Sequence, residues 1–255
     1  MFFQPSNKVG FTPDFFELSY ETRYIDTPDG ERLFAWLMNA KTPKAVVVFL
    51  HGNAGNVSEH LPSVFWLPFY GYTVLAADYR GYGASSGKPS VMGAIVDVQT
   101  AIGYALADPA LSKLPIVVYA QSLGGSLSVT AIDTGGLGDS IALLITEGAF
   151  ASYGEIAQDV AGRSWLTWIA KPFVSSIVER QFDPAVHIGN LAPLPILIIH
   201  GDHDPIVGYN HAHRLFDAAR EPKELWILFG GGHIGNFNNA ASRKRFVETI
   251  ERLMR

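Results

Sequence analysis

Residues 120–125 (A-Q-S-L-G-G) restrict the fold more than any other part of the chain. A run of apolar residues precedes them and a helix-compatible segment, 126–132, follows, so Ser122 stands at a strand-to-helix corner. Such a corner strains the central residue, and neighbouring backbone can approach only if small residues stand two places before and after it. Ala120 and Gly124 meet this need, one methyl group away from G-x-S-x-G. The pattern predicts a nucleophile elbow, the alternative being a small-residue turn after a buried strand.

A serine hydroxyl needs a histidine base, and usually a carboxylate that fixes the tautomer of that base. An apolar strand at 196–200 leads into a tight loop with two carboxylates, and a later apolar run leads into three glycines and His233. Consecutive glycines let a loop bend sharply enough to carry an imidazole over a neighbouring strand end, so His233 is the expected base. Asp204 is the expected acid. Asp202 is the alternative, although it stands only one residue past Gly201.

Histidine and aspartate side chains around the expected acid suggest a metal site as a competing interpretation. They are His200, Asp202, His203, Asp204, His211 and His213. His211 and His213 are two residues apart on an expected helix, so they point to different faces, and neither H-E-x-x-H nor H-x-H-x-D-H occurs. No metal site is therefore expected, and His200 and His203 are interpreted as packing and loop hydrogen-bonding residues.

A second glycine-rich loop, 51–56, follows an apolar strand early in the chain. Such a loop can direct backbone N–H groups at a developing oxyanion. We expect the donors to be the amides of Asn53 and of Leu123, the residue after the nucleophile. A phosphate-binding loop is the competing interpretation, but G-x-G-x-x-G and the lysine of a Walker motif are both missing, so a dinucleotide site is not expected. Neither interpretation explains His51.

Together these segments resemble the α/β-hydrolase superfamily, in the branch of small serine hydrolases that includes carboxylesterases, monoacylglycerol-lipase-like enzymes and protein depalmitoylases. The resembling motifs are H-G-N-A-G-N at 51–56, D-Y-R-G-Y-G-x-S at 78–85, [GA]-x-S-x-G-G at 120–125 and shorter matches at 27–30, 200–204 and 232–233. The resemblance implies hydrolysis of an ester or thioester without a cofactor, and it places the acid at Asp204. Ala120 replaces the usual glycine, and Ile234 stands where a polar residue is common. We interpret Arg80, in the second motif, as a structural ion-pair partner.

The order of patterns along the chain predicts an α/β fold. An antiparallel hairpin, 21–26 with 32–39, is expected at the sheet edge. Strands near 45, 73, 116, 141, 196 and 224 then alternate with helices at 57–69, 91–107, 123–132, 210–219 and 240–255. This alternation predicts a mainly parallel eight-stranded sheet with helices on both faces, forming a single domain over 1–255. The expected catalytic groups all follow strand ends, where ligands bind in such sheets.

One long connection interrupts this alternation, and we expect it to form a small lid at about 148–190. Its aromatic residues suit an apolar substrate wall or a membrane-touching surface. The proposed wall residues are Phe150, Trp165, Trp168 and Phe173. An ordinary amphipathic helix pair packed on the core is the alternative.

The amino-acid composition excludes several kinds of site and partner and indicates where the protein is located. The chain has 255 residues, a net charge of −5 and no cysteine, so a thiol nucleophile, a disulfide and a cysteine-bound metal are excluded, and no nucleic-acid partner is expected. No apolar run reaches about 18 residues, so a cytoplasmic protein is expected. Resemblance to hydrolases with an N-terminal membrane segment leaves an anchor upstream, or membrane contact through the lid, as an alternative.

These observations predict a serine hydrolase that cleaves carboxylic esters of short to medium acyl chains through an acyl-enzyme on Ser122. Cleavage of thioesters, as in depalmitoylation, is the alternative within enzymes. A ligand receptor on the same fold is the alternative outside enzymes, and the complete Ser, Asp and His set argues against it.

Overall fold

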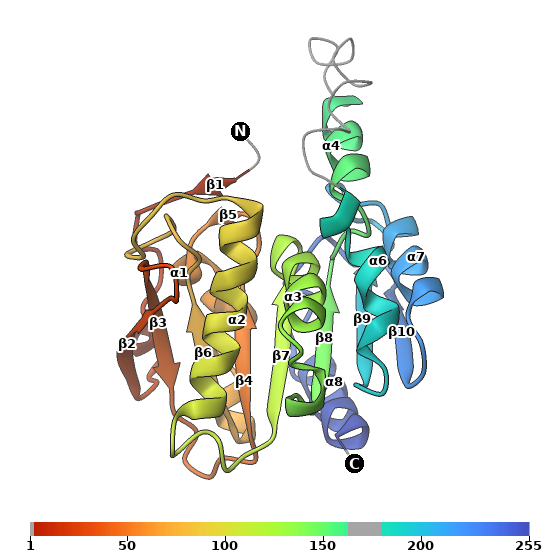
Figure 1. Ribbon diagram of the computed structural model, residues 1–255. Coiled ribbons are helices and arrows are strands. Elements are labelled where there is room, and N and C mark those ends of the chain that lie inside the picture. Colours follow the sequence, from red (N-terminus) through yellow and green to blue (C-terminus); the bar gives the residue numbers. More distant parts are fainter. Residues whose placement is uncertain (1–2, 163–179, 255) are drawn as a thin grey trace.

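The centre of the molecule is an eight-stranded sheet with strand order β10-β9-β8-β7-β4-β6-β3-β2 (Figure 1). The computed structural model describes residues 3–162 and 180–254. β2 pairs antiparallel with β3, β3 pairs antiparallel with β6, and the other neighbours are parallel. The strands are β2 (Tyr20–Asp26), β3 (Arg32–Met38), β4 (Ala45–Leu50), β6 (Tyr72–Ala77), β7 (Ile116–Gln121), β8 (Leu143–Glu147), β9 (Ile196–Gly201) and β10 (Lys223–Leu228). The predicted edge hairpin and mainly parallel sheet are confirmed.

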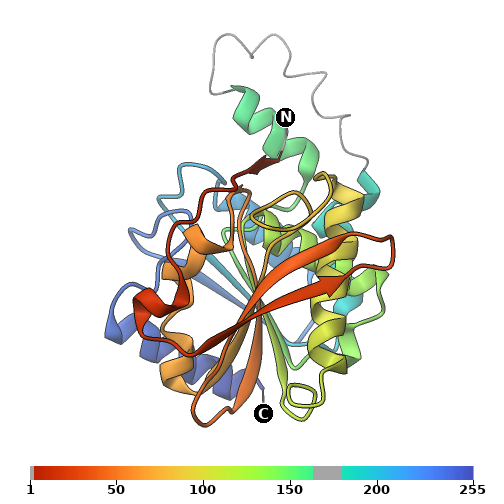
Figure 2. The ribbon, with the colours of Figure 1, turned by 90° about the vertical axis from the view of Figure 1, so that its left-hand side faces the viewer.

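Helices cover both faces of this sheet, and Figure 2 shows the two helical layers on either side of the strands. One layer contains α2 (Val91–Ala107), α3 (Leu123–Thr134), α6 (Pro184–His187) and α7 (Asn210–Ala218). The other contains α1 (Val57–His60) and α8 (Ala240–Leu253). The predicted three-layer arrangement is therefore confirmed.

Each central strand supplies side chains to two hydrophobic cores, because successive residues of a strand point to opposite faces. In β4, Val46, Val48 and Leu50 belong to the core under α2 and α3. Val47 and Phe49 belong to the core under α8. All five side chains are buried, and each contributes about 1.5–3 kcal/mol by leaving water. This double burial explains why the central strands have continuous apolar sequences.

The helix predicted over 57–69 is wrong. The structure has α1 followed by two 3₁₀ turns, η2 (Leu61–Ser63) and η3 (Leu67–Tyr70). Pro62 and Pro68 fall at the first or second position of these turns, and a proline in a helix interior lacks the N–H that the preceding turn would bind. The remaining 3₁₀ turns are η1 (Pro13–Phe16), η4 (Gly138–Ser140), η6 (Arg180–Phe182) and η7 (Ile188–Leu191).

A separate pair of very short strands lies near the carboxyl edge of the main sheet. β1 (Gln4–Pro5) pairs in parallel with β5 (Ala54–Gly55), which belongs to the glycine-rich loop after β4. Two residues are too few to give an alternating pattern, so the sequence does not predict this pair.

The connection expected to form a lid begins beyond the carboxyl end of β8. Its described part includes α4 (Tyr153–Gly162), which stands above the ends of the strands in Figure 1, and η6, α6 and η7, which lead back into β9. Trp165, Trp168 and Phe173 lie outside the described residues. Among the described helices, none is both long and apolar enough to span a bilayer.

Candidate active site

Ser122 stands between β7 and α3 in a strained backbone conformation. Its φ is 51° and its ψ is −117°, a region that residues with a side chain rarely adopt. A Cβ atom at Gly124 would lie 2.5 Å from the carbonyl oxygen of Leu50 and 2.6 Å from that of His51. Only glycine therefore lets the first turn of α3 approach the end of β4. The strand, the strained serine and the tight helix entry together form the sharp corner that the sequence predicted.

The structure brings His233 from the loop after β10 to this serine. Its Nε2 lies 2.8 Å from Ser122 Oγ, and its Nδ1 lies 2.6 Å from Asp204 Oδ2. Because an ionised carboxylate only accepts, Nδ1 carries the proton and donates to Asp204. Nε2 is then free to accept the hydrogen bond that the Ser122 hydroxyl donates. This tautomer is the one that a general base needs.

Gly148, directly after β8, makes room for the imidazole. Its φ is +66°, and a Cβ atom there would lie 2.4 Å from the backbone oxygen of His233 and 3.2 Å from its Nδ1. A larger residue would therefore both strain the backbone and displace the histidine.

Both carboxylate oxygens of Asp204 have hydrogen-bond partners. Its Oδ1 accepts from the backbone N–H groups of Ile206 (2.7 Å) and Val207 (2.9 Å). Its Oδ2 faces His200 Nε2 at 3.0 Å in addition to His233, and its side chain is fully buried. Burial alone would raise the pKa of Asp204, but the hydrogen bonds from His200 and His233 and the charge of His233 outweigh it and hold the pKa well below its usual range. The carboxylate is therefore ionised at neutral pH.

Asp202, the alternative acid, faces another way. Its Oδ1 accepts from the Gly230 N–H at 2.7 Å and from Nδ1 of the exposed His203 at 2.7 Å. These hydrogen bonds tie the loop after β9 to the loop after β10. Asp204 is therefore the carboxylate that contacts His233, whereas Asp202 connects the two loops.

The glycine-rich loop after β4 lies against the serine. A Cβ atom at Gly52 would be 3.5 Å from the Ser122 Cβ, and Asn53 is the next residue along this loop. Leu123 is the first residue of α3, where a backbone N–H has no acceptor inside its own helix. The two amides expected as oxyanion donors belong to the loop after β4 and to the first turn of α3, and their role stays a prediction.

His51 has a structural place at the start of this loop. It is fully buried, its Nδ1 lies 2.7 Å from the Gly52 oxygen, and its Nε2 lies 3.1 Å from Asp78 Oδ1. Its ring packs against Tyr79 and Tyr82. These contacts account for a histidine that the sequence left unexplained.

Arg80 is an ion-pair partner, as expected from the sequence. Its guanidinium lies 2.8 Å from Asp97 Oδ1 and 2.7 Å from Asp29 Oδ2, and its side chain is only 8% exposed. The pairing joins α2 to the turn of the edge hairpin. Arg80 follows β6, and β4 lies between β6 and β7, the strand that leads to Ser122.

Glu147, at the end of β8, was not identified from the sequence. It is fully buried, and its Oε2 accepts from the Tyr119 hydroxyl (2.5 Å) and from Gln121 Nε2 (2.6 Å). Its Oε1 accepts from the backbone N–H (3.1 Å) and side-chain Nδ2 (2.8 Å) of Asn236, three residues past His233. Glu147 therefore fastens the loop of His233 to the strands beside the nucleophile. A glutamate that ends an apolar strand was the signal available in the sequence.

Phe150 lies in the hydrophobic core rather than on an open surface. It is 3% exposed and packs edge-on against Tyr153. Little of its side chain is available to a ligand in this conformation. The other proposed wall residues, Trp165, Trp168 and Phe173, are outside the described residues, so their placement stays a prediction.

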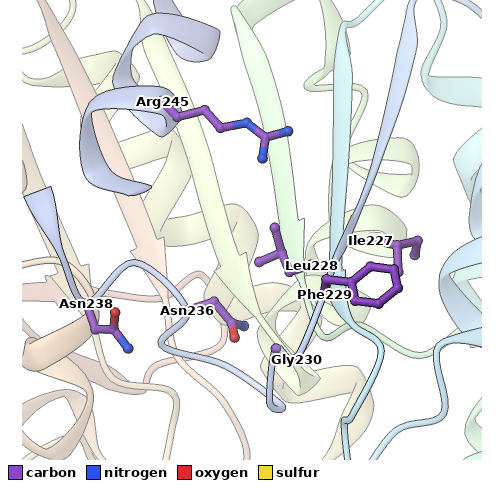
Figure 3. Close-up of a pocket in the computed structure, with 8 residues that line it drawn as sticks. Ile227, Leu228, Phe229, Gly230, Asn236, Asn238 and Arg245 are labelled. Atoms are coloured by element: carbon purple, nitrogen blue, oxygen red, sulfur yellow. The ribbon is translucent and has the colours of Figure 1, made fainter. Parts of the chain in front are cut away.

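A cavity of about 450 Å³ lies beside the carboxyl end of β10 (Figure 3). Arg245 reaches toward it from α8, and Asn236 and Asn238 come from the loop between β10 and α8. Its lining residues are Ile227, Leu228, Phe229, Gly230, Gly231, Asn236, Asn238 and Arg245. Neither Ser122, Asp204 nor His233 lines this cavity, so it is separate from the serine site.

The histidines considered for a metal site do not gather around one point. His211 is buried and its Nδ1 accepts from the Ala151 N–H at 3.2 Å, whereas His213 packs against Tyr209. Within residues 3–162 and 180–254, no group of three or more potential ligand side chains is arranged to hold a metal ion.

The sequence also matches a known protein family. The model of the serine aminopeptidase S33 family matches residues 41–192, more than half of the chain. The chain belongs to this family. It is an α/β-hydrolase, as the sequence predicted.

Relatives and solved structures agree with this placement. The chain is 33% identical over 246 residues to YfhR of Escherichia coli K12, covering 93% of this chain and 81% of YfhR. It is 33% identical over 228 residues to the protein bem46 of Schizosaccharomyces pombe, covering 86% of this chain and 68% of bem46. The esterase Pf2001 of Pyrococcus furiosus superposes with a TM-score of 0.78 at 22% identity, covering 99% of this chain and all of Pf2001. This last similarity shows the shared fold.

Proposed function

We propose that this α/β-hydrolase is a serine hydrolase that cleaves carboxylic esters through an acyl-enzyme on Ser122. The observation that carries the proposal is the continuous hydrogen-bonded chain from Ser122 through His233 to the buried Asp204. Without a base, a serine hydroxyl is a poor nucleophile, and this chain supplies both the base and its correct tautomer. The strained elbow holds Ser122 Oγ within 2.8 Å of that base.

In the proposed first step, Ser122 Oγ attacks the acyl carbon while His233 Nε2 takes the hydroxyl proton. The negative charge that develops on the substrate carbonyl oxygen is stabilised by the amides of Asn53 and Leu123. His233 then gives its proton to the leaving alcohol, and the C–O bond to that alcohol breaks. The product of this step is a Ser122 acyl ester.

The second step reverses the roles with water. His233 Nε2 takes a proton from a water molecule, whose oxygen attacks the acyl carbon, and the proton then returns to Ser122 Oγ as the carboxylic acid leaves. Throughout, Asp204 keeps the Nδ1 proton in place and stabilises the transient imidazolium. Its low pKa suits this role, because it stays ionised while His233 gains and loses a proton.

The test combines covalent labelling with a substrate panel. A fluorophosphonate probe should label the wild-type protein at Ser122 and should not label Ser122→Ala. p-Nitrophenyl esters of increasing chain length should be hydrolysed, with acyl-CoA thioesters and amino-acid p-nitroanilides measured beside them. A folded protein that is neither labelled nor active on any ester would contradict the proposal, and a strong preference for the thioester or the anilide would replace its substrate class.

A further inference from the structure

Residues 3–11, here called the N-terminal arm, lie along the glycine-rich loop 52–56. β1 of the arm pairs with β5 of the loop, the Ser6 N–H donates to the Gly55 oxygen at 2.9 Å, and the Gln4 N–H donates to Asn53 Oδ1 at 3.2 Å. The loop therefore lies between Ser122, which is near Gly52, and the arm, which runs along its later residues.

Asn56 joins the arm to the end of the loop with both ends of its amide. Its Nδ2 donates to the backbone oxygens of Ser6 (2.9 Å) and Lys8 (2.7 Å). Its Oδ1 accepts from the N–H of Ser58 (2.9 Å) and so caps α1. The side chain is 3% exposed, so these hydrogen bonds are protected from water. The oxygen of this amide therefore caps α1, and its NH₂ group binds the arm.

Tyr82 holds the same loop at Asn53. Its hydroxyl lies 2.8 Å from the Asn53 backbone oxygen and 2.9 Å from Asn53 Oδ1. Phe3 of the arm packs edge-on against the Tyr82 ring at 6.4 Å, and both side chains are buried. The arm thus supports the loop directly through hydrogen bonds and indirectly through Tyr82.

This support matters because the loop has little rigidity of its own. It contains Gly52 and Gly55, the latter at φ +82°, and glycine has the widest conformational freedom. An oxyanion donor accelerates a reaction only if it is fixed at the position that the negative charge will occupy. A displacement of about 1 Å can cost about 100-fold in rate.

We propose that the N-terminal arm is a positioning element for the oxyanion donor at Asn53, acting through Asn56 and Tyr82. This inference rests on the proposed function, because it assigns the loop to an oxyanion. The arm itself does not contact the reacting atoms. It sets the transition-state stabilisation and leaves substrate binding in the ground state unchanged.

Two variants with matched controls test it. Asn56→Asp keeps the oxygen that caps α1 but removes the donor to Ser6 and Lys8, and Asn239→Asp makes the same change at the N-cap of α8, whose Oδ1 accepts from Ser242. Tyr82→Phe removes the hydroxyl that holds Asn53. Its control, Tyr72→Phe, removes a buried hydroxyl that has no hydrogen-bond partner among the described residues.

The measurements are kcat and KM for p-nitrophenyl butyrate, the Kd of phenylboronic acid as a tetrahedral analogue, and Tm. We expect Asn56→Asp and Tyr82→Phe to lower kcat by about 10-fold to 100-fold, to leave KM within about twofold, and to weaken phenylboronic acid by a factor similar to the loss in kcat. Both controls should behave as the wild type. A third variant, Phe3→Ala, removes the packing of the arm on the Tyr82 ring without adding a charge, and it keeps the test of the arm valid if Asn56→Asp prevents folding.

The outcomes separate this inference from the proposed function. If the wild type hydrolyses esters and both loop variants match their controls, the positioning role is wrong and the proposed function stands. If the variants raise KM with kcat unchanged, the arm shapes substrate binding and the inference is again overturned. If the folded wild type neither hydrolyses esters nor reacts with the fluorophosphonate, the proposed function fails and the inference falls with it.

Discussion

Replacement of Asp204 by asparagine tests the tautomer argument at the proposed acid. The Oδ1 atom accepts from the N–H groups of Ile206 and Val207, so the asparagine oxygen should keep that position. Its NH₂ group then takes the place of Oδ2, 2.6 Å from His233 Nδ1. Because an NH₂ group donates, Nδ1 must accept, and the imidazole proton moves to Nε2. His233 would then point a proton at Ser122 and could not act as its base.

The opposite orientation of the asparagine amide in Asp204→Asn is higher in energy. It would place the NH₂ group against the two backbone N–H groups, and the N–H of the buried Val207 would lose Oδ1 as its acceptor, which costs about 1–3 kcal/mol. The wrong tautomer is therefore the lower-energy state, and turnover should fall by about 10⁴. His200 Nε2 lies 3.0 Å from Oδ2 and 2.8 Å from the Val207 oxygen, so the NH₂ group also changes the surroundings of His200, and the loss of stability must be measured in parallel.

The assay compares Asp204→Asn with Asp202→Asn by kcat on p-nitrophenyl butyrate and by urea unfolding. Asp202 accepts from Gly230 and the exposed His203, so its variant should change kcat by less than about threefold, corresponding to about 0.7 kcal/mol. The urea unfolding curve reports the folded fraction of each variant without depending on the reactivity of Ser122. If folded Asp204→Asn keeps more than about a tenth of wild-type turnover, the tautomer argument is refuted, since a lost triad acid costs far more.

Further outcomes concern the elbow, a half-buried histidine and the ion pair. Gly124→Ala should lower the free energy of unfolding by about 1–3 kcal/mol through overpacking against Leu50 and His51, whereas Gly103→Ala, which meets no atom within 4 Å in α2, should not; urea unfolding decides. Burial lowers the pKa of His60 to about 4, below its unfolded value of about 6.5, so the folded state resists protonation and wild-type Tm should fall as pH drops through this window. A His60→Asn variant should show a flatter Tm profile between these pH values, and an equal slope would contradict the assignment. Asp97→Ala should lower the free energy of unfolding by about 3–5 kcal/mol, because it leaves the buried Arg80 guanidinium with Asp29 alone. Calorimetry at pH 7 measures the effect, and a Tm close to that of the wild type would contradict this expectation.

Local patterns explain what the sequence could predict. The buried strand before Ser122 and the small residues around it define the corner without reference to distant residues. Asp204 and His233 could be expected near Ser122 because the carboxyl ends of parallel strands meet at one edge, even though 111 residues separate Ser122 from His233. The structure brings these three side chains into hydrogen-bonding distance.

Features that depend on strand register were beyond the sequence. Glu147 reaches Gln121 because the two residues are direct neighbours across β7 and β8, and a single sequence does not specify that register. The contact between Asn56 and the arm joins residues about 50 positions apart through backbone oxygens, which any residue type supplies. The helix expected at 57–69 failed for a different reason: its apolar spacing was given more weight than Pro62 and Pro68.

The carboxylate of Glu147 has a consequence for transplanting this chemistry to another scaffold. Asn236 binds Glu147 through two donors, so the turn that carries His233 is docked onto a side chain from a different strand. A graft of residues 229–239 into a second hydrolase would bring the imidazole but leave its docking partner behind. We therefore expect the segment to be exchangeable only together with the end of β8, so that the unit of recombination in this fold is a loop plus the strand end that receives it.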